Sequence, residues 1–130
     1  SFAMSVAVAA AHARTLFGRM GGAVTVAAVA TEVIDETAAH PELKRSFEGV
    51  NLPRVKAMLV EQLCSVTGGP CSYTGDTMLD VHAGLKITEA EMNGMVEILR
   101  SVMIRHRVKL RERNELLAIL APMKRDVVTE

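Results

Sequence analysis

The residues that follow Thr88 repeat their apolar side chains with the period of an α-helix, and this constrains the fold more than any other feature. The stripe consists of Met92, Met95, Val96, Leu99, Val102 and Met103. Thr88 and Glu91 have the spacing of a capping box, which marks the beginning of a helix. A run of this length and period predicts a long helix with one apolar face, against which other helices must pack.

Other segments show the same helical spacing, and strand-like alternation is nearly absent. The stripes are Val26, Val29, Ala30, Val33 and Ile34; then Leu52, Val55, Leu59, Leu63 and Val66, with Met58 beside them; and finally Leu116, Ile119, Leu120, Met123 and Val127. Asn51 is the expected N-cap of the second, with Pro53 in its first turn, and Pro122 predicts a kink in the last. A shorter helical segment precedes Gly21 and Gly22. The fold class is therefore all-α.

The length and charge of the chain exclude several classes of protein. The 130 residues favour one domain, spanning 1–130. Formal net charge is zero, which gives no electrostatic footprint for nucleic acid or an anionic membrane, and no apolar run is long enough for a membrane span. Hydrophobic residues make up 49% of the chain but aromatic residues only 3%. A core so poor in large flat side chains is compatible with a flat prosthetic group filling part of it.

Cys64 and Cys71 fit neither a disulfide framework nor a zinc site. We expect a pair of free thiols, which suits a reducing cytoplasm. The apolar stretch from Ala7 to Ala11 is short and follows no basic segment, so a signal peptide is not expected.

The four histidines differ in their surroundings. One histidine, His12, lies near the N-terminus; His40 precedes a proline; and His106 lies within a basic stretch. We expect all three to be solvated. His82 belongs to a short segment between Gly75 and Gly84 that is framed by long apolar helices. Spacing alone leaves two alternatives for His82, a ligand and a half-buried structural histidine. No phosphate-binding loop, nucleophile elbow or zinc-protease motif competes with it.

Five short segments, in their order along nearly the whole chain, resemble the group-one truncated haemoglobins. They are Leu16 to Gly22; Pro41 to Leu43 with Phe47 to Asn51; Gly68 to Pro70 with Tyr73 to Gly75; Val81 to Thr88; and Ala121 to Pro122 with Asp126 to Val128. Each is weak alone, but together they identify His82 with the family's proximal histidine.

The resemblance implies a globin-like, truncated two-over-two helical sandwich that holds b-type haem without a covalent bond, with His82 as the iron ligand. Phe47 would lie against the porphyrin, and Arg54 would meet a propionate. The proximal and rim surfaces would be lined by Tyr73, Met78, Ile87, Met92 and Met95. Met95 favours group one, because the other groups usually have tryptophan at this position.

The chain departs from the family on the distal side, where a tyrosine and a glutamine usually stabilise bound oxygen. Ungapped counting places Ile34, Val55 and Leu59 at those positions, and none of the three can donate a hydrogen bond. We therefore expect binding of a diatomic gas (oxygen, nitric oxide or carbon monoxide) in an apolar pocket. Oxygen binding and transport remain among the expected functions, but the missing donor counts against oxygen storage and against a nitric oxide dioxygenase activity.

Met58 opens an alternative function. Some relatives place a histidine or lysine at this position as a sixth iron ligand, and a thioether can take the same role. A His/Met haem protein would serve electron transfer or redox sensing with an unidentified reductase. If Met58 only fills space in the core, gas binding remains the expected function. A third alternative is an interaction or sensor domain that uses the globin fold with little or no haem.

Overall fold

The computed structural model describes residues 14–77 and 85–128, which form an assembly of helices. The helices are α2 (Leu16–Met20), α3 (Gly22–Ala39), η1 (Lys44–Phe47), α4 (Leu52–Val66), α6 (Glu89–Arg105), α7 (Leu110–Leu120), η2 (Ala121–Met123) and α8 (Lys124–Val127). Two predicted site residues, Met78 and His82, lie outside the described residues, as does His12.

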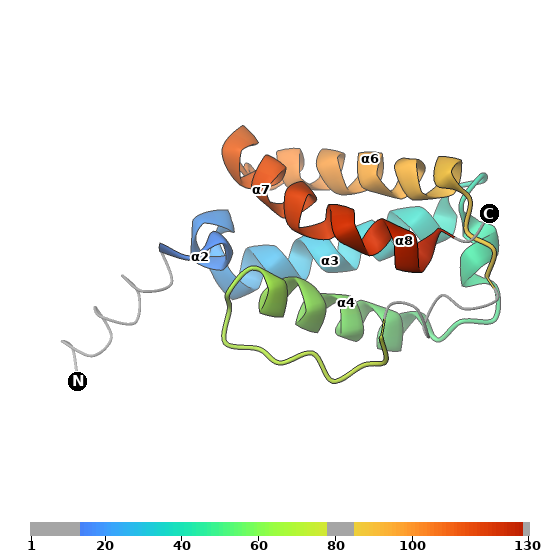
Figure 1. Cartoon of the computed structure of the whole chain (residues 1–130), viewed down its shortest axis with the longest axis horizontal. Helices are drawn as coiled ribbons and strands as arrows, with labels where there is room; N and C mark the ends of the chain where they lie inside the picture. The colour runs from blue at the N-terminus through green and yellow to red at the C-terminus, as the bar shows by residue number, and fades with distance from the viewer. Residues whose placement is uncertain (1–13, 78–84, 129–130) are drawn as a thin grey trace.

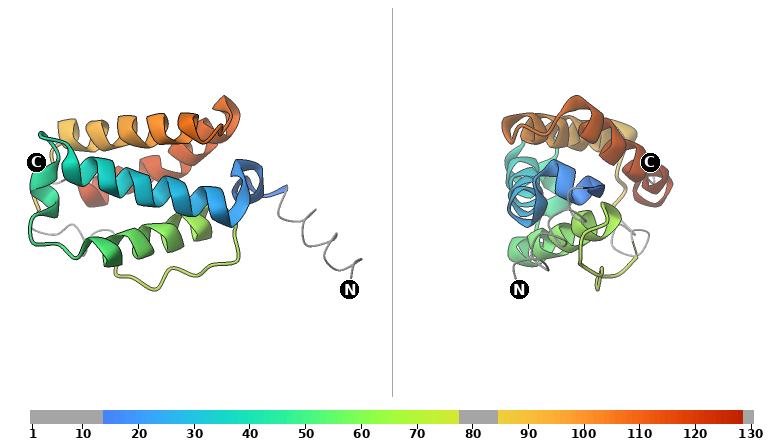
Figure 2. Two further views of the ribbon diagram at one scale, coloured as in Figure 1. Left: turned by 180° about the vertical axis from the view of Figure 1, so that it is seen from behind. Right: turned by 90° about the vertical axis from the view of Figure 1, so that its left-hand side faces the viewer.

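Helix α3 is the centre of the arrangement, because it packs against both α4 and α6. Helices α3 and α4 form one side of the sandwich, and α6 runs across the other side with the chain from α7 to α8 (Figures 1 and 2). Helix α2 and the beginning of α7 lie at one end, whereas η1 and α8 lie at the opposite end. The predicted all-α globin-like fold is confirmed.

The local signals in the sequence form the predicted helix ends. The Asn51 side chain accepts a hydrogen bond of 3.2 Å from the Arg54 amide. Thr88 and Glu91 exchange both bonds of the capping box, each at 3.0 Å. Pro122 lies in η2, a short 3-10 helix that interrupts the last helix where a kink was predicted. Gly21 has a φ of +119°, which lets α2 end and α3 begin without a connecting loop.

The main hydrophobic core lies at the α2 end of the molecule. Fourteen residues form it: Leu16, Phe17, Met20, Val26, Val29, Ala30, Val33, Leu63, Cys64, Leu99, Val102, Met103, Val108 and Leu116. They come from α2, from the first two thirds of α3 and from the second halves of α4 and α6, with Val108 and α7 closing the end. We call this region the closed end.

The expectation of free thiols is wrong, because Cys64 and Cys71 form a disulfide with a Cα–Cα distance of 5.7 Å. Gly68 and Gly69 turn the chain back after α4, and a Cβ on Gly69 would lie only 2.7 Å from the Cys64 sulfur. This tight turn brings the two cysteines together. The inference of a reducing cytoplasm rested on free thiols and loses that support.

Two of the histidines expected to be solvated are half-buried. His106 contacts the Glu32 carboxylate, and the Nδ1 atom of His40 accepts a hydrogen bond of 3.1 Å from the Glu42 amide. The basic stretch around His106 connects the end of α6 to the beginning of α7. Within residues 14–77 and 85–128, no helix has the length and apolar character to cross a membrane.

Candidate functional site

Helices α4 and α6 change from buried to half-buried along their length. On α4, Leu63 and Cys64 are buried, whereas Val55, Met58 and Leu59 are only half-buried. The same change occurs on α6, where Leu99, Val102 and Met103 are buried and Met92, Met95 and Val96 are half-buried. Both helices begin at the end opposite the closed end, so their half-buried apolar residues lie at the same end of the molecule (Figure 1).

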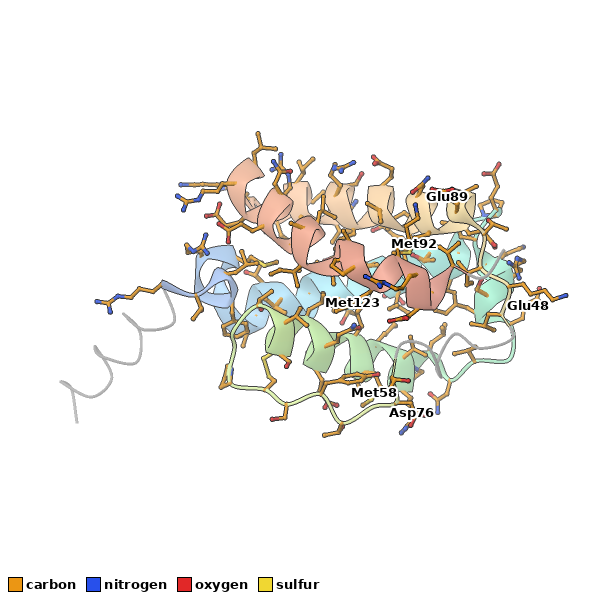
Figure 3. The ribbon with its side chains drawn as sticks, in the orientation of Figure 1. Glu48, Met58, Asp76, Glu89, Met92 and Met123 are labelled. Carbon is orange, nitrogen blue, oxygen red and sulfur yellow. A yellow bond between two sulfur atoms is a disulfide. The ribbon has the colours of Figure 1, made fainter. Side chains whose placement is uncertain are left out.

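We call this second region the open end, and it contains the predicted site residues that the structure describes, apart from Tyr73. They are Ile34 on α3, Phe47 on η1, Arg54, Val55, Met58 and Leu59 on α4, Ile87 just before α6, and Met92 and Met95 on α6. Leu59 and Met95 lie where the two ends meet, because both also pack against the main core. Figure 3 shows Glu48 after η1 and Glu89 at the start of α6 at this same end. Folding therefore assembles residues that are far apart in the sequence.

The open end has its own buried residues, which lie outside the main core cluster. Ile34 is 2% exposed and Ile87 7% exposed, yet neither belongs to the continuous core. Helices α4 and α6 each pack closely on α3 but much less on one another. The half-buried apolar side chains of α4 and α6 therefore lie on two helices that pack mainly on α3 rather than on each other, and a flat apolar group is the kind of ligand that would cover them.

The polar groups next to the predicted distal residues are already engaged. The buried Thr37 hydroxyl donates to the Val33 carbonyl at 2.6 Å. Lys56 on α4 forms an ion pair of 2.6 Å with Asp35 on α3. Ile34, Val55 and Leu59 contribute only hydrocarbon, so the described residues at this position provide an apolar lining.

Sequence reasoning overlooked Gln62, which follows Met58 by four residues and therefore shares its face of α4. Its amide nitrogen donates a hydrogen bond of 3.4 Å to the Met123 sulfur of η2. Figure 3 shows Met123 between α4 and α6 in this view, with Met58 and Met92 on those helices. The helical spacing was the available signal for Gln62, since a polar residue on an apolar face needs a partner.

The segment after α4 returns along that helix and carries Tyr73. Besides the disulfide, Thr74 anchors it by donating from its amide at 3.0 Å and from its hydroxyl at 2.8 Å to the Glu61 carboxylate. Tyr73 is half-buried; burial raises the pKa of its hydroxyl, the charges of Asp76 and Glu61 add to this, and Arg54 opposes it. The exposed Arg54 thus lies close enough to Tyr73 to affect the ionisation of its hydroxyl.

The described residues fit haem as apolar walls but do not include its proposed iron ligand. Among them, no group of three His, Cys, Asp or Glu side chains is arranged to hold a metal ion. Haem needs no such group, since one axial histidine and an apolar cavity suffice. The half-buried Val, Leu, Met and Phe side chains of the open end are the residue types that such a cavity requires.

A second residue that sequence reasoning overlooked is Arg45, on η1. Its guanidinium contacts Glu91 of α6 and the backbone just before that helix. Because Arg45 and Glu91 are 46 positions apart, no local spacing rule connects them.

Comparison with known proteins places these features in a family. The sequence profile of the bacterial-like globins matches residues 15–129. The chain is 28% identical over 119 residues to the group 1 truncated hemoglobin GlbN of Mycolicibacterium paratuberculosis, covering 92% of this chain and 88% of that protein. A group 1 truncated hemoglobin of Tetrahymena thermophila is 22% identical over 89 residues, which are 68% of this chain and 74% of that protein.

The fold also has close structural neighbours. The crystal structure of truncated hemoglobin from Tetrahymena pyriformis in its Fe(III) form superposes with a TM-score of 0.85. The match covers 90% of this chain and all of the other, at 19% sequence identity. At that identity the similarity concerns the fold, and the sequence matches carry the family relationship.

Proposed function

Because the chain belongs to the bacterial-like globin family and its predicted resemblance to truncated haemoglobins is confirmed, we propose that it binds haem b non-covalently through His82 and takes up a diatomic gas. The observation that carries the proposal is the set of half-buried apolar residues at the open end, on helices whose core side chains, such as Leu63 and Val102, are buried at the closed end. Haem would supply a ferrous iron that coordinates the gas.

The residues of the open end have separate tasks in this proposal. Phe47, Ile87, Met92 and Met95 provide apolar contacts to the porphyrin and exclude water from it. Arg54 is exposed and near Tyr73, so its charge is available to a propionate at the rim. In the sequence, Met78 and His82 lie between Tyr73, which is near Arg54, and Ile87, which comes just before α6.

The distal lining decides which gas is held well. Oxygen, when bound, gains from a nearby hydrogen-bond donor, whereas carbon monoxide and nitric oxide depend on one much less. Ile34, Val55 and Leu59 have no donor, and the neighbouring Thr37 and Lys56 are engaged elsewhere. We therefore propose fast oxygen dissociation and retention of carbon monoxide and nitric oxide. Oxygen storage and nitric oxide dioxygenation fit this pocket less well. Both nitric oxide dioxygenation and the alternative role in electron transfer would need a reductase partner.

The test is an optical spectrum of the purified, haem-reconstituted protein, reduced, with and without carbon monoxide. We expect a haem band that carbon monoxide shifts in the wild type. His82→Ala should lose most of the bound haem or keep it only with added imidazole. The matched control is His40→Ala, since His40 is half-buried and its Nδ1 atom accepts from the nearby Glu42 amide in the turn after α3.

Two outcomes would contradict the proposal. Native haem occupancy and an unchanged spectrum in His82→Ala would show that another residue binds the iron. A wild-type protein that takes up no haem would favour an interaction domain built on the globin fold.

A further inference from the structure

Arg45 connects η1 to the chain that precedes α6. One guanidinium nitrogen donates to the Leu85 carbonyl at 2.9 Å, and another donates to the Lys86 carbonyl at 2.7 Å. The second nitrogen also contacts the Glu91 carboxylate. One side chain therefore holds three acceptors, two of them on consecutive backbone carbonyls.

The Glu91 carboxylate is itself part of the start of α6. Its Oε1 atom accepts the Thr88 amide at 3.0 Å, and its side chain is only 13% exposed. The contact with Arg45 is the largest cause that lowers the pKa of Glu91. Its Oε2 atom is buried with no hydrogen-bond partner in the part of the chain that the structure describes. The guanidinium thus compensates a nearly buried charge at the helix start.

The backbone next to Arg45 has a conformation that needs support. Lys86 has a φ of +53°, in the left-handed region that non-glycine residues seldom adopt. Its carbonyl is one of the two that Arg45 binds. Because the guanidinium presents its N–H groups in a rigid plane, it fixes the relative orientation of both carbonyls, which a lysine ammonium cannot do.

A second contact attaches the same region to α6. Leu43, just before η1, is 6% exposed and packs against Gly94, where an added Cβ would lie 3.0 Å from the nearest Leu43 methyl. The connection from η1 to residues 85–94 therefore has an apolar part and an ionic part. Phe47 follows Arg45 by two residues on the same short helix.

We propose that Arg45 is a positioning residue for the haem site: it fixes the chain that leaves the His82 segment relative to the helix that carries Phe47. The proposal rests on the proposed function, because it assumes that His82 binds the iron. Leu85 is three residues after His82 in the sequence, so we expect a change in the position of its carbonyl to affect iron ligation by that histidine. Arg45 need not touch the haem to have this effect.

The experiment compares Arg45→Met and Arg45→Lys with Arg105→Met. Arg105 is a matched control, because it also forms side-chain ion pairs, with Glu32 and Glu36, and its side chain is 48% exposed, as is that of Arg45. It lies at the last residue of α6, near the closed end. The measurements are amide hydrogen exchange of residues 85–92, haem release to an excess of a scavenging apoglobin, and the iron–histidine stretching band of the reduced protein.

We expect Arg45→Met to speed haem release roughly tenfold or more, because hydrogen bonds from a charged donor are lost. The iron–histidine band should shift or broaden, and amide exchange over residues 85–92 should accelerate. Arg45→Lys should fall between the wild type and Arg45→Met, since it keeps the charge but not the fork. Arg105→Met should leave the band and haem release unchanged.

An unchanged band and unchanged haem release in Arg45→Met and Arg45→Lys would overturn the positioning role and leave Arg45 as a stabilising contact only. A failure of the proposed function appears differently, as a wild type without haem or a spectrum that survives His82→Ala. If the proposed function fails in this way, the positioning role fails with it. Faster amide exchange of residues 85–92 in haem-free Arg45→Met would then still show that Arg45 stabilises the backbone before α6.

Discussion

The two ends of the molecule are built from the same three helices and reach different degrees of packing. At the closed end, α3, α4 and α6 bury Val29, Leu63 and Val102 almost completely, and α2 and α7 cover them. At the open end, the same helices leave Val55, Met58 and Met92 half-buried. The residue types do not explain this, since Leu, Val and Met occur at both ends.

What differs is the cover that the described chain provides. The closed end is sealed by α2, by α7 and by a disulfide that fastens the segment after α4. The open end is bordered by η1, α8 and the residues around Ile87, and the contacts between them include those of Arg45, the Lys124–Glu89 ion pair and the buried Leu43 against Gly94. We therefore expect the closed end to contribute most of the stability of the haem-free protein and the open end to gain most from a bound group.

The largest expected effect comes from two leucines one turn apart on α4. Leu63 is 2% exposed in the main core, so Leu63→Ala should destabilise the protein by about 2–5 kcal/mol with or without haem. Leu59 is half-buried, so Leu59→Ala should cost less in the haem-free protein and more in the haem-loaded protein. Urea unfolding of both variants, each with and without haem, measures the difference. Equal costs for Leu59→Ala in the two forms would remove the distinction between the ends.

The disulfide gives the next largest effect, and it should be confined to the closed end. Cross-linking across a sequence separation of 7 restricts the unfolded chain, so reduction should lower the free energy of unfolding by about 2–3 kcal/mol. The measurement is urea unfolding with and without a dithiol reductant. The Cys64→Ala/Cys71→Ala double variant is the control, because its unfolding should not respond to the reductant. A shift in that variant would mean that the reductant acts elsewhere.

Local structure was predictable from the sequence because its causes are local. Asn51, the Thr88–Glu91 pair and Pro122 act through neighbours within four residues, and each forms the predicted helix end or interruption. The apolar stripe from Val26 to Ile34 is likewise buried as its period requires. The resemblance to truncated haemoglobins supplied the arrangement of the helices in space, which periodicity alone does not give.

The contacts between distant segments were not predictable in the same way. Arg45 and Glu91 meet only because η1 and the start of α6 lie at the same end of the molecule. The disulfide was missed because two cysteines alone do not form a recognisable framework, although the turn at Gly68 and Gly69 between the cysteines was a usable signal. The change in burial along α4 could not be seen either, because a helical stripe gives no indication of what covers each of its turns.

A donor placed at the open end tests whether its lining determines oxygen binding. Ile34 is 2% exposed on α3, and Ile34→Tyr should slow oxygen dissociation about ten- to hundredfold if the hydroxyl reaches the gas. Ile34→Phe is the matched control, because it adds the same ring without the hydroxyl. Oxygen release after rapid mixing measures the rates. Slow release already in the wild type would show that another group supplies the donor.

The smallest expected effect concerns Met58, and it separates gas binding from electron transfer. Met58 shares its helix face with Gln62, whose amide donates to Met123 of η2, so that face of α4 is directed toward η2. Met58→Leu keeps the volume and should change the stability by less than about 1.5 kcal/mol. Met92→Leu is the control, since Met92 is also half-buried at the open end but lies on α6.

For gas binding at a five-coordinate iron we expect both variants to keep the wild-type spectrum and midpoint potential. A thioether ligand favours ferrous iron, so its loss would lower the potential and remove a low-spin spectrum that carbon monoxide displaces. If Met58→Leu alone produced that change, Met58 would be the sixth ligand and the protein would belong with the electron-transfer haem proteins.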